Sequence, residues 1–368
     1  KRAVVAAISL MTGLTMLTGC SKAEVEETIQ PLVADAIEES DSEAEAVDEQ
    51  DESPLIPEID TDVKIEAGSR IAVVSKSVKG EYWKMVKKGM EDAVKEINKA
   101  YGYKKDDQIT MTFEGPDNEE DVETQINTID AVIAENPDVL CISASDMDSC
   151  EAQLEAAKEN GIPVIAFDSN VAEKKLVKAY RGTDNVQVGK MAAYQLGSAL
   201  GKMGKVAVFS AQQKTKSVQD RVEGFMNNIG KYGDIEVVET IYSDQVDDME
   251  ASMKEVLEKY PTLDGVFCTN ADITEMYLNL EKSDEHDAPA LVGVDATTKQ
   301  QEAIRNGEEI GCVSQQPYAM GYQTIWAAVE TTAPKKSVVI EKNVLSNPAW
   351  IDADCLDDPD YSGYLYTE

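Results

Sequence analysis

The chain has 368 residues, which is enough for two domains with hydrophobic cores of their own. Its 70 acidic and 34 basic residues give a net charge of −36. A surface of that sign repels phosphate backbones, so the composition argues against a nucleic-acid partner. Most of these charges are expected to serve solubility and colloidal stability.

The first twenty residues have the pattern of an export signal. Lys1 and Arg2 precede an apolar run over residues 3–17, which is too short for a membrane span. Leu17-Thr18-Gly19 then leads into Cys20, and this ending resembles the lipobox of bacterial lipoproteins. The resemblance implies a signal peptide over residues 1–19, lipid on Cys20, and anchoring to the outer face of the bacterial cell membrane. The alternative is an ordinary signal peptide with a cysteine placed there by chance.

Residues 20–66 have the composition of a linker. Between residues 21 and 66 there are 17 acidic residues against two lysines, and no aromatic residue. Such a segment cannot bury enough apolar surface to offset its ordering entropy. We therefore expect a disordered, acidic, self-repelling spacer here.

From residue 67 onward, short apolar runs alternate with stretches of helical periodicity. Predicted strands in the first half are 70–75, 109–113, 139–143, 162–167 and 176–180. Predicted helices between them are 82–100, 120–134 and 150–160. Helices follow at 186–201, 217–229, 247–260, 273–280, 299–306 and 319–331. They alternate with strands at 206–210, 235–242, 265–268, 290–294, 311–314 and 337–341, before an irregular tail from 347.

This alternation predicts parallel sheets that are covered by helices on both faces. The number of strands is too large for one compact open sheet of this type. The fold class is therefore expected to be α/β, with two doubly wound parallel-sheet lobes. A (β/α)8 barrel is the competing topology.

Eight short motifs lie in the predicted strands or in the loops and helix starts that come after them. They are IAVV at 71–74, EYW at 81–83, GIPVIAFD at 161–168, TDN at 183–185, DRVEGF at 220–225, FCTN at 267–270, VGVD at 292–295 and SQQPY at 314–318. The ordered set resembles the ribose-binding-protein family of type 1 periplasmic sugar-binding proteins, and it covers about residues 70–341. The resemblance implies two lobes joined by a three-stranded hinge. It assigns 67–183 plus 315–343 to the N-terminal lobe, and 184–314 plus 344–368 to the C-terminal lobe.

The resemblance also implies a ligand site between the lobes, at the carboxyl ends of the strands. The side chains it brings to that site are Lys76, Tyr82, Trp83, Asp168, Ser169, Arg221, Asn270, Asp295 and Gln315. Carboxylates and amides suit sugar hydroxyls, and arginine offers a planar fork of donors. Tyr82 and Trp83 are expected to sandwich the sugar ring.

Five positions depart from the family pattern, namely Lys76, Gly80, Ser169, Asp244 and Ala271. The pocket is therefore not expected to copy a ribose pocket. Lys76 either pairs with Asp168 or meets an acidic sugar.

Most of these residues also have a purely structural interpretation. Asp168 and Asp295 could only cap the helix that follows each strand. Arg221 could be a surface salt-bridge partner. Tyr82 and Trp83 could simply pack the first helix.

The expected function is extracytoplasmic solute binding. A monomeric lipoprotein would capture a small carbohydrate, either a monosaccharide or a related polyol, and deliver it to the permease of an ATP-binding-cassette importer. No cofactor and no metal is expected, since neither a Cys/His ligand spacing nor a calcium loop occurs. The alternative is a sensor that reports the ligand to a membrane kinase or chemoreceptor.

An exported enzyme is the alternative from a different class. The chain has one histidine, His286, and lacks both a GxSxG elbow and a GxxxxGK[ST] phosphate loop. With histidine-based catalysis and a phosphate loop unsupported, the remaining enzyme hypothesis is a glycosidase that uses Asp168 and Asp295 as its pair of carboxylates. We therefore expect no catalytic activity.

Five cysteines remain besides Cys20, and three of them lie in apolar, strand-like runs. These are expected to be small buried hydrophobes. A Cys312–Cys355 bridge that pins the tail is the alternative for one pair.

Overall fold

The computed structural model describes residues 56–280, 288–334 and 338–367. The export signal, Cys20, most of the acidic linker and His286 lie outside the described residues. None of the helices within these ranges is both long enough and apolar enough to cross a membrane.

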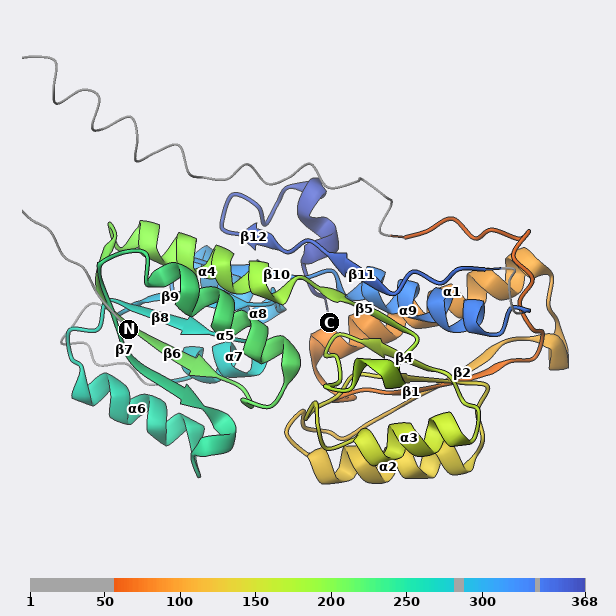
Figure 1. Ribbon diagram of the computed structural model, residues 1–368. Helices are drawn as coiled ribbons and strands as arrows, with labels where there is room; N and C mark the ends of the chain where they lie inside the picture. The colour runs from red at the N-terminus through yellow and green to blue at the C-terminus, as the bar shows by residue number, and fades with distance from the viewer. Residues whose placement is uncertain (1–55, 281–287, 335–337, 368) are drawn as a thin grey trace, which may run out of the picture. The chain divides into compact units, whose positions relative to one another are not determined.

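The first lobe is built on a fully parallel six-stranded sheet. Its strands lie in the order β11 (Asn343–Ser346), β5 (Ala179–Thr183), β4 (Val164–Phe167), β3 (Val139–Ile142), β1 (Arg70–Val74) and β2 (Thr110–Glu114). Its helices are α1 (Gly80–Tyr101), α2 (Val122–Ala134), α3 (Glu151–Glu159) and α9 (Pro317–Thr331). Figure 1 shows α1 and α9 on one side of this sheet and α2 and α3 on the other. We call this unit lobe 1.

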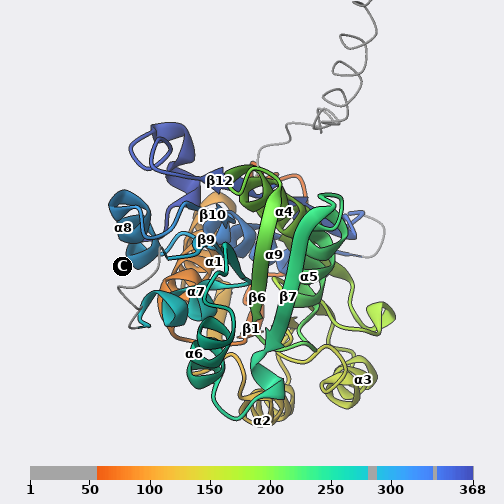
Figure 2. The same ribbon diagram turned by 90° about the vertical axis from the view of Figure 1, so that its left-hand side faces the viewer.

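The second lobe repeats this plan with six strands, of which only β12 is antiparallel. The order is β12 (Ala349–Ile351), β10 (Gly311–Ser314), β9 (Ala290–Val294), β8 (Gly265–Cys268), β6 (Met203–Ser210) and β7 (Asp234–Tyr242). Its helices are α4 (Asn185–Ala199), α5 (Lys216–Ile229), α6 (Met249–Lys259), α7 (Ala271–Leu278) and α8 (Thr298–Asn306). Figure 2 shows α4 and α5 on one side of β6 and β7, and α6 and α7 on the other. We call this unit lobe 2.

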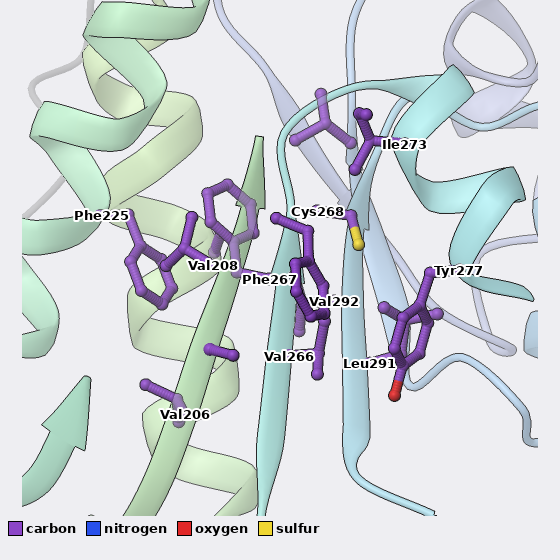
Figure 3. Packing of buried hydrophobic residues seen from close by; sticks show 14 of the residues in the cluster. Val206, Val208, Phe225, Val266, Phe267, Cys268, Ile273, Tyr277, Leu291 and Val292 are labelled. Atoms are coloured by element: carbon purple, nitrogen blue, oxygen red, sulfur yellow. The ribbon is translucent and has the colours of Figure 1, made fainter. Parts of the chain in front are cut away.

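Alternating strand residues supply the two faces of each sheet. In lobe 1, Ile71 and Val73 pack in the cluster that includes α1 and α9, whereas Ala72 and Val74 pack in the cluster that includes α2 and α3. In lobe 2, Phe267 of β8 stacks on Phe225 of α5, with ring centroids 4.5 Å apart (Figure 3). The central strands are therefore buried on both faces, as their continuous apolar runs predict. The prediction of two parallel-sheet α/β lobes is confirmed.

Two predicted strands, one lobe boundary and the tail differ from the structure. The strand expected at 337–341 is wrong, since residues 338–341 lie outside any strand and the edge strand is β11. Residues 344–346, which we expect in the C-terminal lobe, pair with β5 in the sheet of lobe 1. The strand expected at 176–180 begins later, at Ala179, because Lys174–Leu176 forms a 3-10 turn. The tail is not wholly irregular, because it contains β12.

The five cysteines among the described residues are free thiols, so the Cys312–Cys355 bridge is not formed. Four of them are buried, and burial raises the pKa of the Cys150 thiol to about 12. These side chains therefore pack as small hydrophobes rather than as reactive thiolates.

Candidate functional site

A cavity of about 250 Å³ lies between lobe 1 and lobe 2. Residues that follow strands line it from both sides: Lys76 and Asp168 from lobe 1, and Asn270, Asp295 and Gln315 after strands of lobe 2. Open α/β sheets place their ligands at this end of the strands. We call this space the inner cavity. Eight of the nine residues named from the sequence line it: Lys76, Tyr82, Trp83, Asp168, Arg221, Asn270, Asp295 and Gln315.

Asp168 is the centre of the hydrogen bonds on the lobe 1 wall. Tyr82 donates its hydroxyl to Oδ1 at 2.7 Å, and Ser143 donates to Oδ2 at 2.7 Å. Lys76 Nζ lies 3.0 Å from the same Oδ2. Burial acts to raise the pKa of Asp168, but Lys76 and these hydrogen bonds outweigh it and hold that pKa below its usual range. Asp168 is therefore a buried carboxylate that is already paired inside the protein.

Lys76 is paired with carboxylates on lobe 1. Its Nζ also lies 3.6 Å from a carboxylate oxygen of Glu119. Burial acts to lower the pKa of Lys76, but the charges of Asp168 and Glu119 outweigh it and raise that pKa. Of the two expectations for Lys76, pairing with Asp168 is the one that the structure shows.

Tyr82 and Trp83 form one aromatic wall. Their ring centroids are 5.1 Å apart and their planes meet at 88°. Two perpendicular neighbouring rings cannot enclose a sugar between parallel faces, so the expected sandwich is wrong. Trp83 donates its indole N–H to Glu119 at 2.6 Å, which fixes the ring against the cavity. Both residues also belong to the core under α1, so they pack the first helix as well as lining the cavity.

Arg221 and Asn270 form part of the wall from lobe 2. Arg221 is buried, and it donates from Nε to Asn185 at 2.8 Å and from Nη1 to the Thr269 carbonyl at 2.7 Å. It is therefore not a surface salt-bridge residue, and its Nη2 has no partner among the described residues. Asn270 caps α7 through Oδ1, which accepts from the Ile273 N–H at 3.1 Å, and this leaves its Nδ2 for other partners.

Asp295 lines the inner cavity from lobe 2, whereas Asp168 lines it from lobe 1. Its Oδ1 accepts from Gln315 at 2.7 Å and from the Tyr366 hydroxyl at 2.8 Å. Its Oδ2 accepts from the Ala271 N–H at 3.1 Å. A carboxylate has about four acceptor positions, so Asp295 keeps capacity for a hydroxyl of a ligand.

Asp168 and Asp295 do not cap the helices that follow them. The N-cap of α8 is Thr297, and the next turn after Asp168 is capped by Glu173. Both aspartates instead adopt a left-handed backbone, with φ of +54° and +77°. That conformation is uncommon outside glycine, and it is often found at functional sites.

Ser169 does not line the cavity, although it directly follows Asp168. Its Oγ lies 2.6 Å from Ser217 Oγ, so the two hydroxyls share a hydrogen bond between lobe 1 and lobe 2. Both residues are buried. Ser169 therefore contacts the opposite lobe rather than the cavity.

Asp272 is a carboxylate that sequence reasoning missed. It lines the cavity from the first turn of α7, and it has no hydrogen bond or ion pair within the described ranges. Burial raises its pKa from 3.8 to about 7, and the charges of Glu119, Glu275 and Asp295 add to this. Asp272 is exposed toward the cleft, so the walls around its carboxyl group, rather than enclosure of the whole residue, favour the neutral acid.

The signals for the missed residues differ in strength. The family pattern has an acidic residue at the position of Ala271, and Asp272 is the next residue. Allowing the pattern to move by one position would therefore have identified Asp272. Glu119 follows the end of β2, which is the same topological position as the other candidates. Tyr366 lies in the tail, near the end of the chain, and no local pattern points to it.

The walls offer acceptors and donors for hydroxyl groups, plus an aromatic face. No group of three or more His, Cys, Asp or Glu side chains in the described part of the chain is arranged to hold a metal ion. The arrangement suits a small polyhydroxylated molecule that is bound by side chains alone.

Comparison with known protein families gives one match over most of the chain. Residues 71–336 match the periplasmic binding protein domain. The ribose import binding protein of Bacillus subtilis is 26% identical over 220 residues, which are 60% of this chain and 71% of that protein. The xylitol-binding protein of Mycolicibacterium smegmatis is 25% identical over 211 residues, which are 57% of this chain and 60% of that protein.

Solved structures with the same fold include two solute-binding proteins of ATP-binding-cassette transporters from Agrobacterium vitis. One has bound D-fucose, with a TM-score of 0.73 and 26% identity over 81% of this chain and 100% of that chain. The other has bound alpha-D-tagatopyranose, with a TM-score of 0.74 and 25% identity over 82% of this chain and 100% of that chain.

Proposed function

The chain belongs to the periplasmic binding protein family, and from this premise we propose that it is an extracytoplasmic solute-binding protein for a small carbohydrate. The ligand lies in the inner cavity, between lobe 1 and lobe 2. The observation that carries this proposal is the lining of that cavity, where Asp168 and Asp295 face it from opposite lobes beside Arg221 and an aromatic wall. The sugar and polyol ligands named for the relatives support the same class of ligand.

The walls can bind hydroxyls from both lobes at once. Arg221 Nη2 and Asn270 Nδ2 are available as donors, and Asp295 keeps acceptor capacity. A ligand that bonds to both walls favours the arrangement in which the lobes are together, which is the basis of hinge closure in two-lobed binding proteins.

A thermal-shift panel tests the proposal. Pentoses, hexoses, polyols, amino acids and sugar acids are each added separately to the purified chain, at concentrations of about 1–10 mM. Because a ligand that binds only the folded state raises its apparent stability, at least one neutral sugar or polyol is expected to raise Tm. A shift produced only by another class of solute would contradict the carbohydrate assignment.

Binding is proposed to occur without chemical change to the sugar. Asp168 is held by Lys76, Tyr82 and Ser143, and Asp295 is held by Gln315 and Tyr366, so neither carboxylate is a free acid or base. Recovery of the bound sugar unaltered after overnight incubation is the expected result. Release of reducing sugar from chromogenic glycosides would contradict it.

We further propose that lipid on Cys20 anchors the protein as a monomer beside the permease of an ATP-binding-cassette importer. The tether would raise the concentration of the binding protein near that permease. Metabolic labelling with a radioactive fatty acid is expected to mark the wild-type chain and not Cys20→Ser. Equal labelling of the two would contradict the anchor.

A further inference from the structure

A second cavity, of about 480 Å³, opens beside the inner cavity. The two cavities share Asp117, Glu119, Asn270 and Asp272 in their walls, so they meet. We call the second space the outer cavity. It is larger than the inner one and lies on the same cleft between lobe 1 and lobe 2.

One wall of the outer cavity is an apolar surface on lobe 2. Its side chains come from α5, α6 and α7 and from the segment before α6: Val218, Val246, Met249, Ile273 and Met276. Three of these, Val218, Met249 and Ile273, are buried. Apolar side chains of this kind pack against the C–H face of a sugar ring or against an aromatic group.

Gln212 adds an amide to the wall of the outer cavity. It follows β6, its side chain lines the outer cavity, and only 6% of it is exposed. Within the described ranges no hydrogen bond reaches its side-chain oxygen or nitrogen. Because these amide atoms are not sealed off from the cavity, a hydroxyl of a ligand can reach them and supply both a donor and an acceptor.

The charges around the outer cavity restrict what can enter it. The lining contains carboxylates from both lobes, namely Asp117, Glu119, Glu120, Asp247 and Asp272. No lysine or arginine of the described chain lines it. Asp117 and Glu119 each lie 3.6 Å from a lysine Nζ, of Lys79 and Lys76 respectively. Glu120, Asp247 and Asp272 have no ion pair among the described residues, so the wall keeps a negative excess that disfavours phosphate and carboxylate substituents.

We propose that the outer cavity is a second subsite, and that it takes a further uncharged ring attached to the sugar in the inner cavity. The ligand class is then a neutral disaccharide or a glycoside with an uncharged aglycone. This proposal rests on the proposed function, because it assumes a sugar in the inner cavity. The apolar surface packs on the second ring, while Gln212 and Asn270 Nδ2 bond to its hydroxyls.

Matched ligand pairs measured by calorimetry test the second subsite. The pairs are D-glucose with cellobiose, maltose and phenyl glucosides, and D-galactose with lactose and melibiose. At least one extended ligand is expected to bind tenfold more tightly than its parent monosaccharide. If every monosaccharide binds as tightly as its extended relatives, the second subsite is overturned.

Two variants locate the effect in the outer cavity. Gln212→Met keeps the length of the side chain without its amide, and Met276→Trp fills the space beside α7. Both are expected to weaken the extended ligand at least tenfold and to leave the monosaccharide within twofold. Gln213→Met, at the exposed neighbouring position, is the matched control and should change neither.

The monosaccharide measurement separates the two proposals. If monosaccharides bind while the outer variants alter both members of a pair equally, the second subsite is wrong and the proposed function stands. If no saccharide of either size binds and no sugar or polyol of the thermal-shift panel raises Tm, the proposed function fails and the second subsite fails with it.

Discussion

The Asp295 carboxylate accepts hydrogen bonds from three separate segments of the chain at the site. Gln315 after β10, Tyr366 of the tail and the N–H of Ala271 all donate to its carboxylate. Asp295→Asn keeps the shape but removes the charge and one acceptor. We expect the affinity for the best sugar of the thermal-shift panel to fall by about 1–3 kcal/mol, which is roughly five- to 150-fold in Kd.

The matched control is Asp234→Asn, which changes an exposed carboxylate at the start of β7. Calorimetric titration should give it the wild-type Kd. Equal affinity of Asp295→Asn and wild type would remove Asp295 from the binding surface.

The raised pKa of Asp272 predicts a dependence of stability on pH. Its pKa is raised from 3.8 to about 7, by burial first and then by Glu119, Glu275 and Asp295. Between those values the folded chain holds a proton at Asp272 that the unfolded chain has lost, so this carboxylate lowers stability progressively as pH rises through about 7. Asp272→Asn is therefore expected to match the wild-type Tm near pH 4 and to exceed it at pH 8. A constant difference in Tm across that range would contradict the assignment.

At the scale of elements, each lobe contains one pair of helices in very close contact. In lobe 2, a Cβ built on Gly189 of α4 would lie 1.9 Å from the carbonyl oxygen of Arg221 in α5, and one on Gly224 would lie 2.1 Å from that of Val186. In lobe 1, Gly89 of α1 and Gly321 of α9 meet carbonyls of the opposite helix in the same way. Glycine is required at these crossings, because any side chain would push the backbones apart.

Gly189→Ala links this packing to the site. The helices α4 and α5 must separate, which outweighs the gain in helix propensity and is expected to destabilise the fold by about 1–3 kcal/mol. Because α5 carries Arg221, the affinity for sugar should fall as well. Urea unfolding and calorimetry measure the two effects. Gly233→Ala, where a Cβ meets nothing within 4 Å, is the control that should stay within about 0.5 kcal/mol.

The sequence predicted central strands better than edge strands. The strands at the centre of each sheet are buried on both faces, so their apolar runs are unambiguous. β11 is half exposed, with Asn343 at its start, and β12 has only three residues. Edge strands carry little apolar signal, and their place is decided by tertiary pairing with β5 and β10, which no local pattern encodes.

At the scale of the whole molecule, the two lobes repeat one strand order, and this explains which site residues were predictable. β4 and β9 occupy the same place in their sheets, and each is followed by an aspartate in a left-handed conformation, Asp168 and Asp295. Residues at strand ends could therefore be named from motifs. Tyr366 reaches Asp295 only because the tail folds back to the cleft, and the Tyr82–Trp83 angle depends on packing under α1. Neither follows from local sequence.

Ligand exchange is expected to require separation of the lobes, because buried hydrogen bonds join the two lobes directly. Ser169 Oγ of lobe 1 lies 2.6 Å from Ser217 Oγ of lobe 2, and Thr215 donates to the Ser145 carbonyl at 2.6 Å. A sugar enclosed between the two walls must wait for these contacts to break. The Ser169–Ser217 contact joins the two lobes directly, so it is the place to test a covalent link between them.

The double variant Ser169→Cys with Ser217→Cys should therefore hold the lobes together when oxidised. We expect its on-rate and off-rate for the bound sugar to fall at least tenfold and to recover when a reductant is added. Stopped-flow exchange of the sugar measures both rates. Ser169→Cys alone, treated with the same oxidant, controls for the thiols already present and should exchange at the wild-type rate. Fast exchange by the oxidised double variant would mean that sugar reaches the inner cavity without separation of the lobes at this contact.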